Sequence, residues 1–359
     1  MPNRTRSVLV RLTALASFVL FAGWTGCGGT GQGQSHFFPT GNTVEGRWKH
    51  TATSLPNGKV LIAGGADGFP FEGVELYDPS TGMFTATGSM TEARSDSTAT
   101  LLPSGLVLIA GGSMLDDASA ELYDPIAAMF TATGSMTEAR SGHSATLLPT
   151  GKVLIAGGLG TGAELYDPEV GTFTATGNMT TMRCSPKATL LGNGKVLITG
   201  GGCDIGSVLA SAELYDPWTG VFTVTGNLTG PRVTHTATRL GDGKVLIAGG
   251  VGCSSVPGDD TCASAEVYDP ETEIFTTTGS MTWARWAATA TLLPSGMVLV
   301  VDGEDFWGNA ELFDPSVGKF SPAGNTTTPR IDHTATLLPN GSVLIAGGYP
   351  GLESAELYE

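Results

Sequence analysis

A short pattern of apolar and polar positions recurs along this chain. Each copy starts with a mixed segment, Thr-Ala-Thr-Leu-Leu at Thr334 to Leu338, and continues with a nearly continuous apolar run such as Lys59 to Ala63. An apolar run of this length between turn residues is typical of a strand that is buried on both faces. Two more strand-like segments follow, close to Ala-Glu-Leu-Tyr and Phe-Thr-Ala-Thr. The pattern predicts four β-strands per copy, which we call strands A, B, C and D.

Turn residues separate these strands in a regular way. Asp-Pro ends strand C, as at Asp78-Pro79, and starts the C–D turn. Strands A and B are joined by a pair that ends in glycine, and such pairs accept the positive φ angles of a tight hairpin. The pairs are Asn57-Gly58, Ser104-Gly105, Thr150-Gly151, Asn193-Gly194, Asp242-Gly243, Ser295-Gly296 and Asn340-Gly341. No segment after the first 26 residues shows helical periodicity.

The copies number seven, and their spacing predicts the architecture. The aromatic residue of strand C occurs at intervals of 43 to 53 residues, at Tyr77, Tyr123, Tyr166, Tyr215, Tyr268, Phe313 and Tyr358. A repeat of that length with four strands is typical of a propeller blade. A single blade cannot bury both of its faces, so the copies must pack in one closed array. The sequence therefore predicts an all-β, seven-bladed β-propeller.

The two ends of the chain complete each other. The seventh copy stops at Glu359, directly after its strand C. Residues 37–47 align with Phe84 to Arg94, which form a strand D and the arginine after it. We expect this N-terminal segment to supply the outer strand of the last blade, which would remove a free sheet edge.

The repeats resemble the kelch family, including its galactose-oxidase-like branch. The resemblance covers residues 37–359 and rests on Tyr-Asp-Pro after strand C and on a Gly-Gly pair after strand B. These pairs are Gly64-Gly65, Gly111-Gly112, Gly157-Gly158, Gly200-Gly201, Gly249-Gly250 and Gly347-Gly348. The sixth copy departs from the pattern with Asp302-Gly303. The resemblance implies a propeller of kelch-like blades but indicates little about activity.

Copper chemistry is the activity that the galactose-oxidase-like branch suggests. In those oxidases a Tyr-His pair at the start of strand A binds copper; here His333 matches, but Asp332 replaces the tyrosine. The oxidases also use a second tyrosine cross-linked to a cysteine, and a histidine from an extra C-terminal domain that this sequence does not extend into. Gly-x-Ser-x-Gly, His-Glu-x-x-His and phosphate-loop motifs are absent from the sequence. We therefore predict no metal, no cofactor and no catalytic residues.

The composition and the N-terminal segment indicate the cellular compartment of the protein. Charged residues make up 14% of the chain and the formal net charge is -16, which disfavours nucleic acid as a partner. Three arginines precede the short apolar stretch Leu12 to Phe21, so residues 1–26 are predicted to be a signal peptide of the lipoprotein type. Gly26-Cys27 resembles a lipobox, which makes Cys27 a candidate lipid anchor; the alternative is plain secretion. Residues 27–36 would then be a flexible linker, and the propeller would be exported and would meet a membrane only through its anchor.

Four further cysteines suggest an oxidising compartment. Cys253 and Cys262 lie in one long insertion that a disulfide could close. If the hairpin at Asn193-Gly194 pairs Gly192 with Lys195, Cys184 falls directly opposite Cys203. We expect two disulfides, and the alternative for the second pair is two unrelated thiols.

Three residue types occur about once per repeat, and we expect structural roles for them. Histidine holds one repeat position at His50, His143, His235 and His333, whereas Ser97, Pro186 and Ala288 replace it elsewhere. A residue that drops out so freely is more simply a hydrogen-bonding partner than a metal ligand or base. The arginine before strand A and the glutamate of strand C recur in every copy. They should form buried contacts; the alternative is an arginine ring that binds carboxylates at the central channel.

The variable loops are the best candidates for binding. Length variation concentrates in the B–C connections, which share one face of a propeller with the D–A connections. This face should carry aromatic residues at Trp48, Trp283, Trp286, Phe306, Trp307 and Tyr349. It should also carry acidic residues, among them Asp67, Asp116, Asp117, Asp204, Asp259, Asp260, Glu304 and Asp305.

Aromatic side chains beside carboxylates suit the stacking of sugars or the binding of a peptide. We therefore predict an extracytoplasmic binding module for a glycan or protein ligand. One alternative is a sugar-directed enzyme of the isomerase, mutarotase or oxidase kind. The other is that these aromatic residues only pack the loops.

Overall fold

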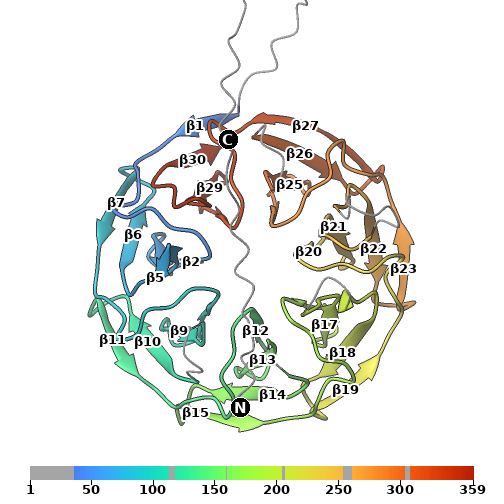
Figure 1. Cartoon of the computed structure of the whole chain (residues 1–359), viewed down its shortest axis with the longest axis horizontal. Helices are drawn as coiled ribbons and strands as arrows, with labels where there is room; N and C mark the ends of the chain where they lie inside the picture. The colour runs from blue at the N-terminus through green and yellow to red at the C-terminus, as the bar shows by residue number, and fades with distance from the viewer. Residues whose placement is uncertain (1–35, 113–117, 159, 204–206, 254–260, 304–307) are drawn as a thin grey trace, which may run out of the picture. The chain divides into compact units, whose positions relative to one another are not determined.

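The structure is a computed structural model that describes residues 36–112, 118–158, 160–203, 207–253, 261–303 and 308–359. These residues form seven antiparallel sheets of four strands each, arranged as blades around a central axis (Figure 1). The fold is the predicted all-β, seven-bladed propeller. Within the described ranges, no helix is long and apolar enough to cross a membrane.

The blades follow one another in chain order, with strand A nearest the axis (Figure 1). Blades 1 and 2 consist of β2 (Thr51–Ser54), β3 (Val60–Ala63), β6 (Val74–Asp78), β7 (Met83–Ala86), β8 (Thr98–Leu101), β9 (Val107–Ala110), β10 (Ala120–Asp124) and β11 (Met129–Ala132). Blades 3 and 4 consist of β12 (His143–Leu147), β13 (Val153–Gly157), β14 (Ala163–Asp167), β15 (Thr172–Ala175), β16 (Lys187–Leu190), β17 (Val196–Thr199), β18 (Ala212–Asp216) and β19 (Val221–Val224).

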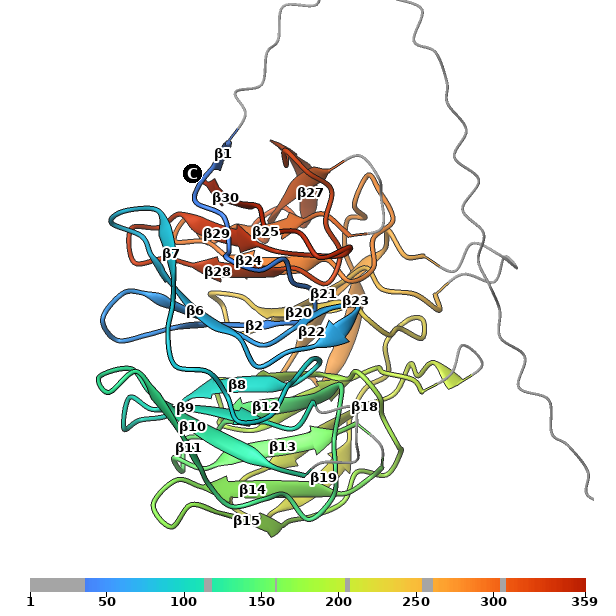
Figure 2. The same cartoon turned by 60° about the vertical axis from the view of Figure 1, so that its left-hand side comes forward.

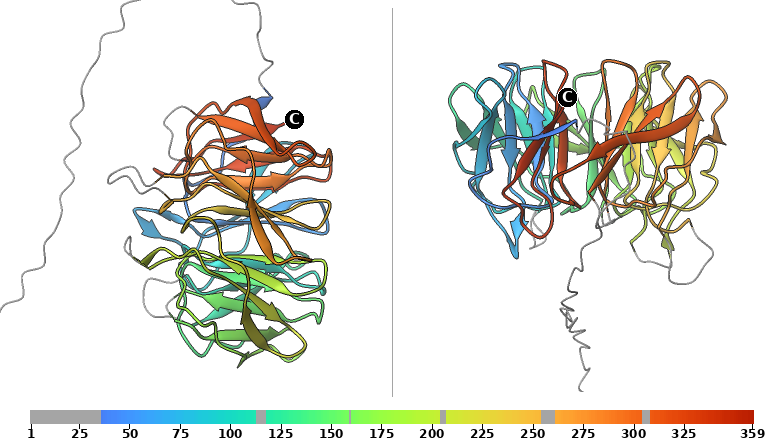
Figure 3. Two further views of the ribbon diagram at one scale, coloured as in Figure 1. Left: turned by 90° about the vertical axis from the view of Figure 1, so that its right-hand side faces the viewer. Right: turned by 90° about the horizontal axis from the view of Figure 1, so that it is seen from above.

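Blades 5 and 6 consist of β20 (Thr236–Arg239), β21 (Val245–Ala248), β22 (Ala265–Asp269), β23 (Ile274–Thr277), β24 (Thr289–Leu292), β25 (Val298–Val301), β26 (Asn309–Asp314) and β27 (Lys319–Asn325). Blade 7 consists of β28 (Thr334–Leu337), β29 (Val343–Ala346), β30 (Ala355–Tyr358) and β1 (Phe37–Pro39). A two-stranded ribbon of β4 (Ala66–Asp67) and β5 (Phe69–Pro70) extends the B–C connection of blade 1. The strands run between the two faces of the ring, so the connections gather on those faces (Figure 3).

The hydrophobic core lies between blades, because each strand B is buried on both of its faces. In β3, Val60 and Ile62 pack with residues of blade 7, whereas Leu61 and Ala63 pack with residues of blade 2. Side chains alternate across a strand with a period of two, so a continuous apolar run serves two interfaces at once. Each blade therefore depends on both of its neighbours, which is the physical reason for a closed ring.

The N-terminal strand closes that ring as the sequence predicts. β1 pairs antiparallel with β30, with Phe37 opposite Tyr358 and Pro39 opposite Glu356. Figure 2 shows the blue β1 beside the dark red β30, although they stand at opposite ends of the described chain. Phe37 is buried in the same cluster as Val343 and Ile345 of β29. The last sheet is thus completed from both ends of the chain.

The A–B hairpins differ by one residue from the expected register. In blade 4, Leu191 donates its N–H to the carbonyl of Lys195 at 2.9 Å, so the loop has three residues rather than two. Only the glycine of the pair adopts a positive φ angle, as Gly194 does at 82°. The Asn193 side chain instead accepts the N–H of Lys195 at 3.1 Å. A turn followed by a left-handed glycine is the common three-residue hairpin.

This shift corrects the argument for the disulfide but not the disulfide itself. Gly202, not Cys203, lies opposite Cys184 and donates its N–H to the carbonyl of Cys184 at 2.9 Å. Cys184 and Cys203 are nevertheless bonded, with their Cα atoms 4.9 Å apart. Cys253 and Cys262 form the second predicted disulfide. Disulfides are typical of exported proteins, since the cytosol keeps thiols reduced.

Every blade contains the expected arginine–glutamate pair, and the pairs are buried. They are Arg47–Glu75, Arg94–Glu121, Arg140–Glu164, Arg183–Glu213, Arg232–Glu266, Arg285–Glu311 and Arg330–Glu356. Each arginine also donates to the backbone carbonyl at the end of strand B, as Arg183 does to Gly200 at 2.8 Å. The pair thus fastens the incoming D–A connection to strands B and C of its own blade. The alternative of an arginine ring at the channel is wrong, because these side chains face partners inside the blades.

Blade 6 carries a buried carboxyl where the other blades have the first glycine of their pair. Asp302 is fully buried, has a φ of 50°, and accepts a hydrogen bond from the Thr326 hydroxyl at 2.8 Å. Its second oxygen, Oδ2, has no hydrogen-bond partner among the described residues. Burial raises the pKa of Asp302 to about 8, although the Thr326 hydrogen bond and nearby arginines oppose the shift. The folded protein therefore holds this carboxyl protonated at neutral pH.

We expect Asp302→Asn to stabilise the protein at alkaline pH. Between pH 4 and pH 8 the carboxyl is protonated in the folded chain and ionised in the unfolded chain. Folding then requires proton uptake, so the native protein loses stability as pH rises through this window. The asparagine variant does not titrate, and its melting temperature should exceed that of the native protein by several degrees at pH 9 and match it near pH 4. A difference that stays constant from pH 4 to pH 9 would contradict a protonated Asp302.

Candidate functional site

A ring of seven left-handed residues surrounds the channel at the face where strands A begin. They occupy one repeat position, directly before the histidine position, and their φ angles lie between 50° and 60°. They are Lys49, Asp96, Gly142, Ser185, Thr234, Ala287 and Asp332. Six of them donate their backbone N–H to the carbonyl of the equivalent residue in the neighbouring blade, at 2.9–3.4 Å. The backbone hydrogen bonds thus run around the ring, and the side chains of this position line the channel.

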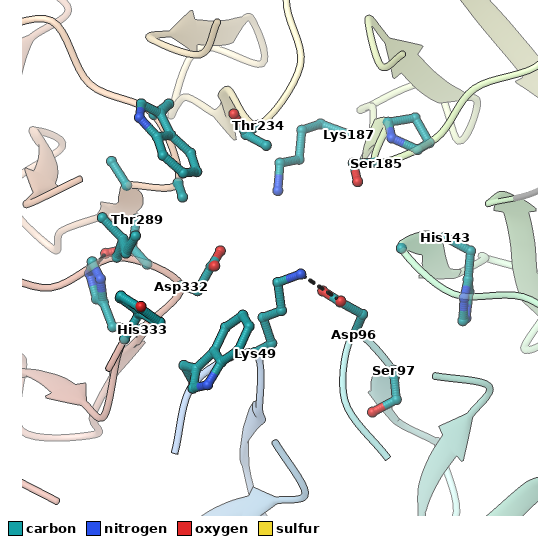
Figure 4. A pocket seen from close by; sticks show the side chains of 18 residues that line it. Lys49, Asp96, Ser97, His143, Ser185, Lys187, Thr234, Thr289, Asp332 and His333 are labelled. Atoms are coloured by element: carbon teal, nitrogen blue, oxygen red, sulfur yellow. Dashed lines mark hydrogen bonds and ion pairs between the residues drawn. The ribbon is translucent and has the colours of Figure 1, made fainter. Parts of the chain in front are cut away.

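The ring opens into a cavity of about 590 Å³, which is the size of a small-molecule site. Among the described residues, its wall contains four charged side chains, several hydroxyls and three large aromatic side chains. The charged ones are Lys49, Asp96, Lys187 and Asp332, and Figure 4 shows that they point toward the middle of the cavity. The aromatic ones are Trp48, Trp286 and Tyr349.

The charged groups are not all neutralised by one another. Lys49 donates to Asp96 at 2.8 Å, and both side chains of this pair are about one-third exposed (Figure 4). Asp332 and Lys187 face the same space without a direct ion pair in the part of the chain that the structure describes. Burial raises the pKa of Asp332, while Lys49 opposes that shift. Loss of solvation lowers the pKa of Lys187, opposed by the charge of Asp332.

The aromatic side chains predicted for this face divide into two groups. Trp48 and Tyr349 make an edge-to-face contact, with their ring centres 5.5 Å apart. Trp286, which directly precedes Ala287 in the sequence, also lies on the cavity wall. Trp283 is 49% exposed and does not line the cavity. The structure therefore brings three of the predicted aromatic residues to one site and leaves Trp283 outside it.

Several predicted binding residues lie outside the described part of the chain. They are Phe306, Trp307, Asp116, Asp117, Asp204, Asp259, Asp260, Glu304 and Asp305. Cys27 also lies outside it, so the lipid anchor stays a prediction. Asp67 is described and exposed, in the ribbon of blade 1.

The histidines are structural hydrogen-bonding residues at the blade interfaces. Each Nε2 lies 2.8–2.9 Å from a threonine hydroxyl of the preceding blade; the pairs are His50–Thr334, His143–Thr98, His235–Thr199 and His333–Thr289. All four rings are buried. Burial lowers the pKa of His333 to about 3, and a neighbouring arginine adds to the shift. These imidazoles are neutral and are held through Nε2, whereas their Nδ1 atoms have no hydrogen-bond partner among the described residues.

The donor set does not fit the copper site of the galactose-oxidase-like branch. Asp332 stands in the place of the tyrosine ligand, and His333 turns its Nε2 to Thr289 inside a blade interface. The four described cysteines form disulfides, so none of them is free to cross-link a tyrosine. Among the residues that the structure describes, no group of three or more His, Cys, Asp and Glu side chains is placed to hold a metal ion.

The ring position is the part of the site that sequence reasoning missed. Its residues stand beside the histidine position, inside a motif that is otherwise nearly uniform, and they vary from lysine to aspartate to alanine. This variation could have indicated a functional position. A residue with the same structural role in every blade would be expected to be the same in every copy. Lys187 was missed for the same reason, since it stands where other copies have threonine or serine.

Comparison with known proteins supports the fold. No family model matches the chain, and no curated protein matches it. A solved structure described as a novel fungal alcohol oxidase of the AA5 family, in complex with copper, has a TM-score of 0.72. The two sequences are 19% identical, and the match covers 90% of this chain and 76% of that chain. At this identity the match shows a shared fold, which is the predicted seven-bladed propeller.

Proposed function

We propose that this chain is an exported carbohydrate-binding protein that takes its ligand at the mouth of the central channel. The observation that carries the proposal is the cavity of about 590 Å³, where Trp48, Trp286 and Tyr349 stand beside Lys187 and Asp332, which form no ion pair among the described residues. Aromatic faces stack on the C–H surface of a sugar ring. Carboxylates accept hydrogen bonds from the sugar hydroxyls, and protein hydroxyls both donate to them and accept from them. Two disulfides support an oxidising compartment.

A sugar-directed enzyme remains the second candidate because of one observation. Asp332 and Lys187 share the cavity, and burial moves both pKa values toward neutrality. Groups with such shifts are suited to move protons at a bound sugar. Product formation from a bound sugar, followed by NMR, would favour the enzyme; unchanged sugar after long incubation would favour the binding protein.

We expect Trp286→Ala to weaken sugar binding several-fold, since one stacking contact contributes about 0.5–1.5 kcal/mol beyond the buried area. Trp283→Ala is the matched control, because Trp283 precedes Trp286 by three residues and lies outside the cavity. Glycan-array screening would identify a ligand, and calorimetry would compare the variants. Equal losses in both variants, or no binding of any glycan, would contradict a carbohydrate site at the channel.

A further inference from the structure

Lys187 occupies a repeat position that carries a hydroxyl in every other blade. The equivalent residues are Thr51, Thr98, Ser144, Thr236, Thr289 and Thr334. Three of these hydroxyls, on Thr98, Thr289 and Thr334, hydrogen-bond the histidine of the following blade. The others donate to the carbonyl of the paired residue in strand B, as Ser144 does to Ala156 at 3.0 Å. Blade 4 has a lysine in this position although the next blade has His235, which needs a partner.

A second departure in the same blade supplies that missing partner. Thr199 is paired directly with Lys187 across β16 and β17. Other blades have alanine or valine at this place in strand B: Ala63, Ala110, Ala156, Ala248, Val301 and Ala346. The Thr199 hydroxyl lies 2.9 Å from His235 Nε2 in a fully buried contact. The two departures therefore compensate each other. Thr199 makes the hydrogen bond to the histidine of the next blade, so the side chain at position 187 can extend into the channel.

Among the described residues, no carboxylate forms an ion pair with the ammonium of Lys187. In the described chain Lys187 makes no ion pair or hydrogen bond through its side chain, whereas Lys49 is paired with Asp96. Its chain extends into the open middle of the cavity (Figure 4). Protein surrounds it closely enough to lower its pKa, and Asp332 is near enough to oppose that shift. The Lys187 side chain is exposed to the channel, and an accessible cation without a counter-ion is a favourable partner for a ligand anion.

We propose that Lys187 pairs with a carboxylate of the ligand, so that the preferred ligand is an acidic sugar such as a hexuronate. This inference rests on the proposed carbohydrate function and names its substrate class. A uronate matches the other groups on the wall as well: its ring faces suit Trp286 and Trp48, and its hydroxyls suit Asp332, which accepts hydrogen bonds. The acidic surface of the protein does not prevent this, because charges beyond about 8 Å are screened at physiological salt.

The test compares matched pairs of ligands, methyl glucuronide with methyl glucoside and methyl galacturonide with methyl galactoside, by calorimetry on the intact exported protein. The native protein should prefer a uronide to its neutral partner by about tenfold or more, and added salt should reduce the preference. In Lys187→Thr, which introduces the hydroxyl residue found at this position in most other blades, the preference should fall to about onefold. Lys152→Met, at an exposed ion pair with Asp167 on an A–B hairpin, is the control that should keep the preference.

Each of the other possible binding results would contradict a specific part of this proposal. An unchanged preference in Lys187→Thr, or equal binding of neutral and acidic sugars to the native protein, overturns the role of Lys187 but leaves the sugar site. Binding of acetate or of a peptide with a free carboxyl terminus in preference to all uronides overturns the acidic sugar as the ligand. Absence of saturable binding for all four glycosides overturns the proposed function and this inference together. Thr199→Ala should lower the melting temperature and retain the preference, which separates the structural residue from the binding one.

Discussion

A chain that begins at Gly41 should unfold far more easily than the full chain and should aggregate. Such a chain lacks β1, so the backbone groups of Ala355–Tyr358 lose their partner strand and form an exposed edge. It also loses Phe37, which is 3% exposed and packs on Tyr358 with ring centres 5.1 Å apart. Removal of one buried aromatic side chain costs about 1.5–3 kcal/mol before the lost backbone hydrogen bonds are counted.

The measurement is urea unfolding combined with size-exclusion chromatography. A chain that begins at Gln34 retains every described strand and should unfold like the full chain, so it controls for the loss of the N-terminus itself. We expect the shorter chain to lose at least about 3 kcal/mol of unfolding free energy and to elute in part as oligomers. Equal unfolding midpoints for the two truncated chains would mean that ring closure by β1 contributes little to stability.

Replacement of one buried arginine should destabilise the protein nearly as much. Arg232 is 1% exposed and donates to Glu266 at 3.0 Å, to the carbonyls of Gly249 and Ser264 at 3.0 Å, and to the Ser264 hydroxyl at 2.9 Å. Arg232→Met leaves a buried carboxylate and two carbonyls without this donor. Loss of one member of a buried pair costs about 3–5 kcal/mol.

Two variants in the same blade test the cause. Lys244→Met removes an exposed ion pair with Asp269 and should change the unfolding free energy by less than about 0.5 kcal/mol. Arg232→Met combined with Glu266→Gln removes both charges and should recover part of the loss, because no unpaired charge stays buried. If the double variant is no more stable than Arg232→Met alone, the unpaired carboxylate is not the source of the destabilisation.

The fold could be predicted from the sequence because its determinants are local and repeated. An apolar strand B and an A–B pair that ends in glycine occur in each copy, and Asp-Pro follows strand C in the first six copies. Each of these features specifies its own element. The hairpin register could not be predicted to the residue. Asn193-Gly194 is compatible with a two-residue or a three-residue loop. The two differ in whether Asn193 also adopts a positive φ angle, which it does not in the folded protein.

The site was less predictable for a different reason. Of the aromatic residues expected on one face, Trp48, Trp286 and Tyr349 line the cavity, whereas Trp283 has a similar sequence context and does not. Lys49 and Asp96 are 47 residues apart and meet only because the ring brings equivalent positions of neighbouring blades together. Contacts between repeats depend on the angle between neighbouring blades around the central axis, and no local sequence pattern specifies that angle.

The sequence by itself determined the strands, the number of blades, the closure by residues 37–39 and the pairing of arginine with glutamate, because each depends on a motif that recurs at a fixed place in the repeat. Only the tertiary structure decided which residues face the channel. The left-handed backbone at Asp332 and its equivalents turns one side chain per blade toward the axis, and the exchange of tasks between Lys187 and Thr199 depends on their pairing across two strands. The sequence of a single strand does not show which residue of the neighbouring blade it will hydrogen-bond. The set of side chains that lines the channel is therefore defined only when the ring is closed.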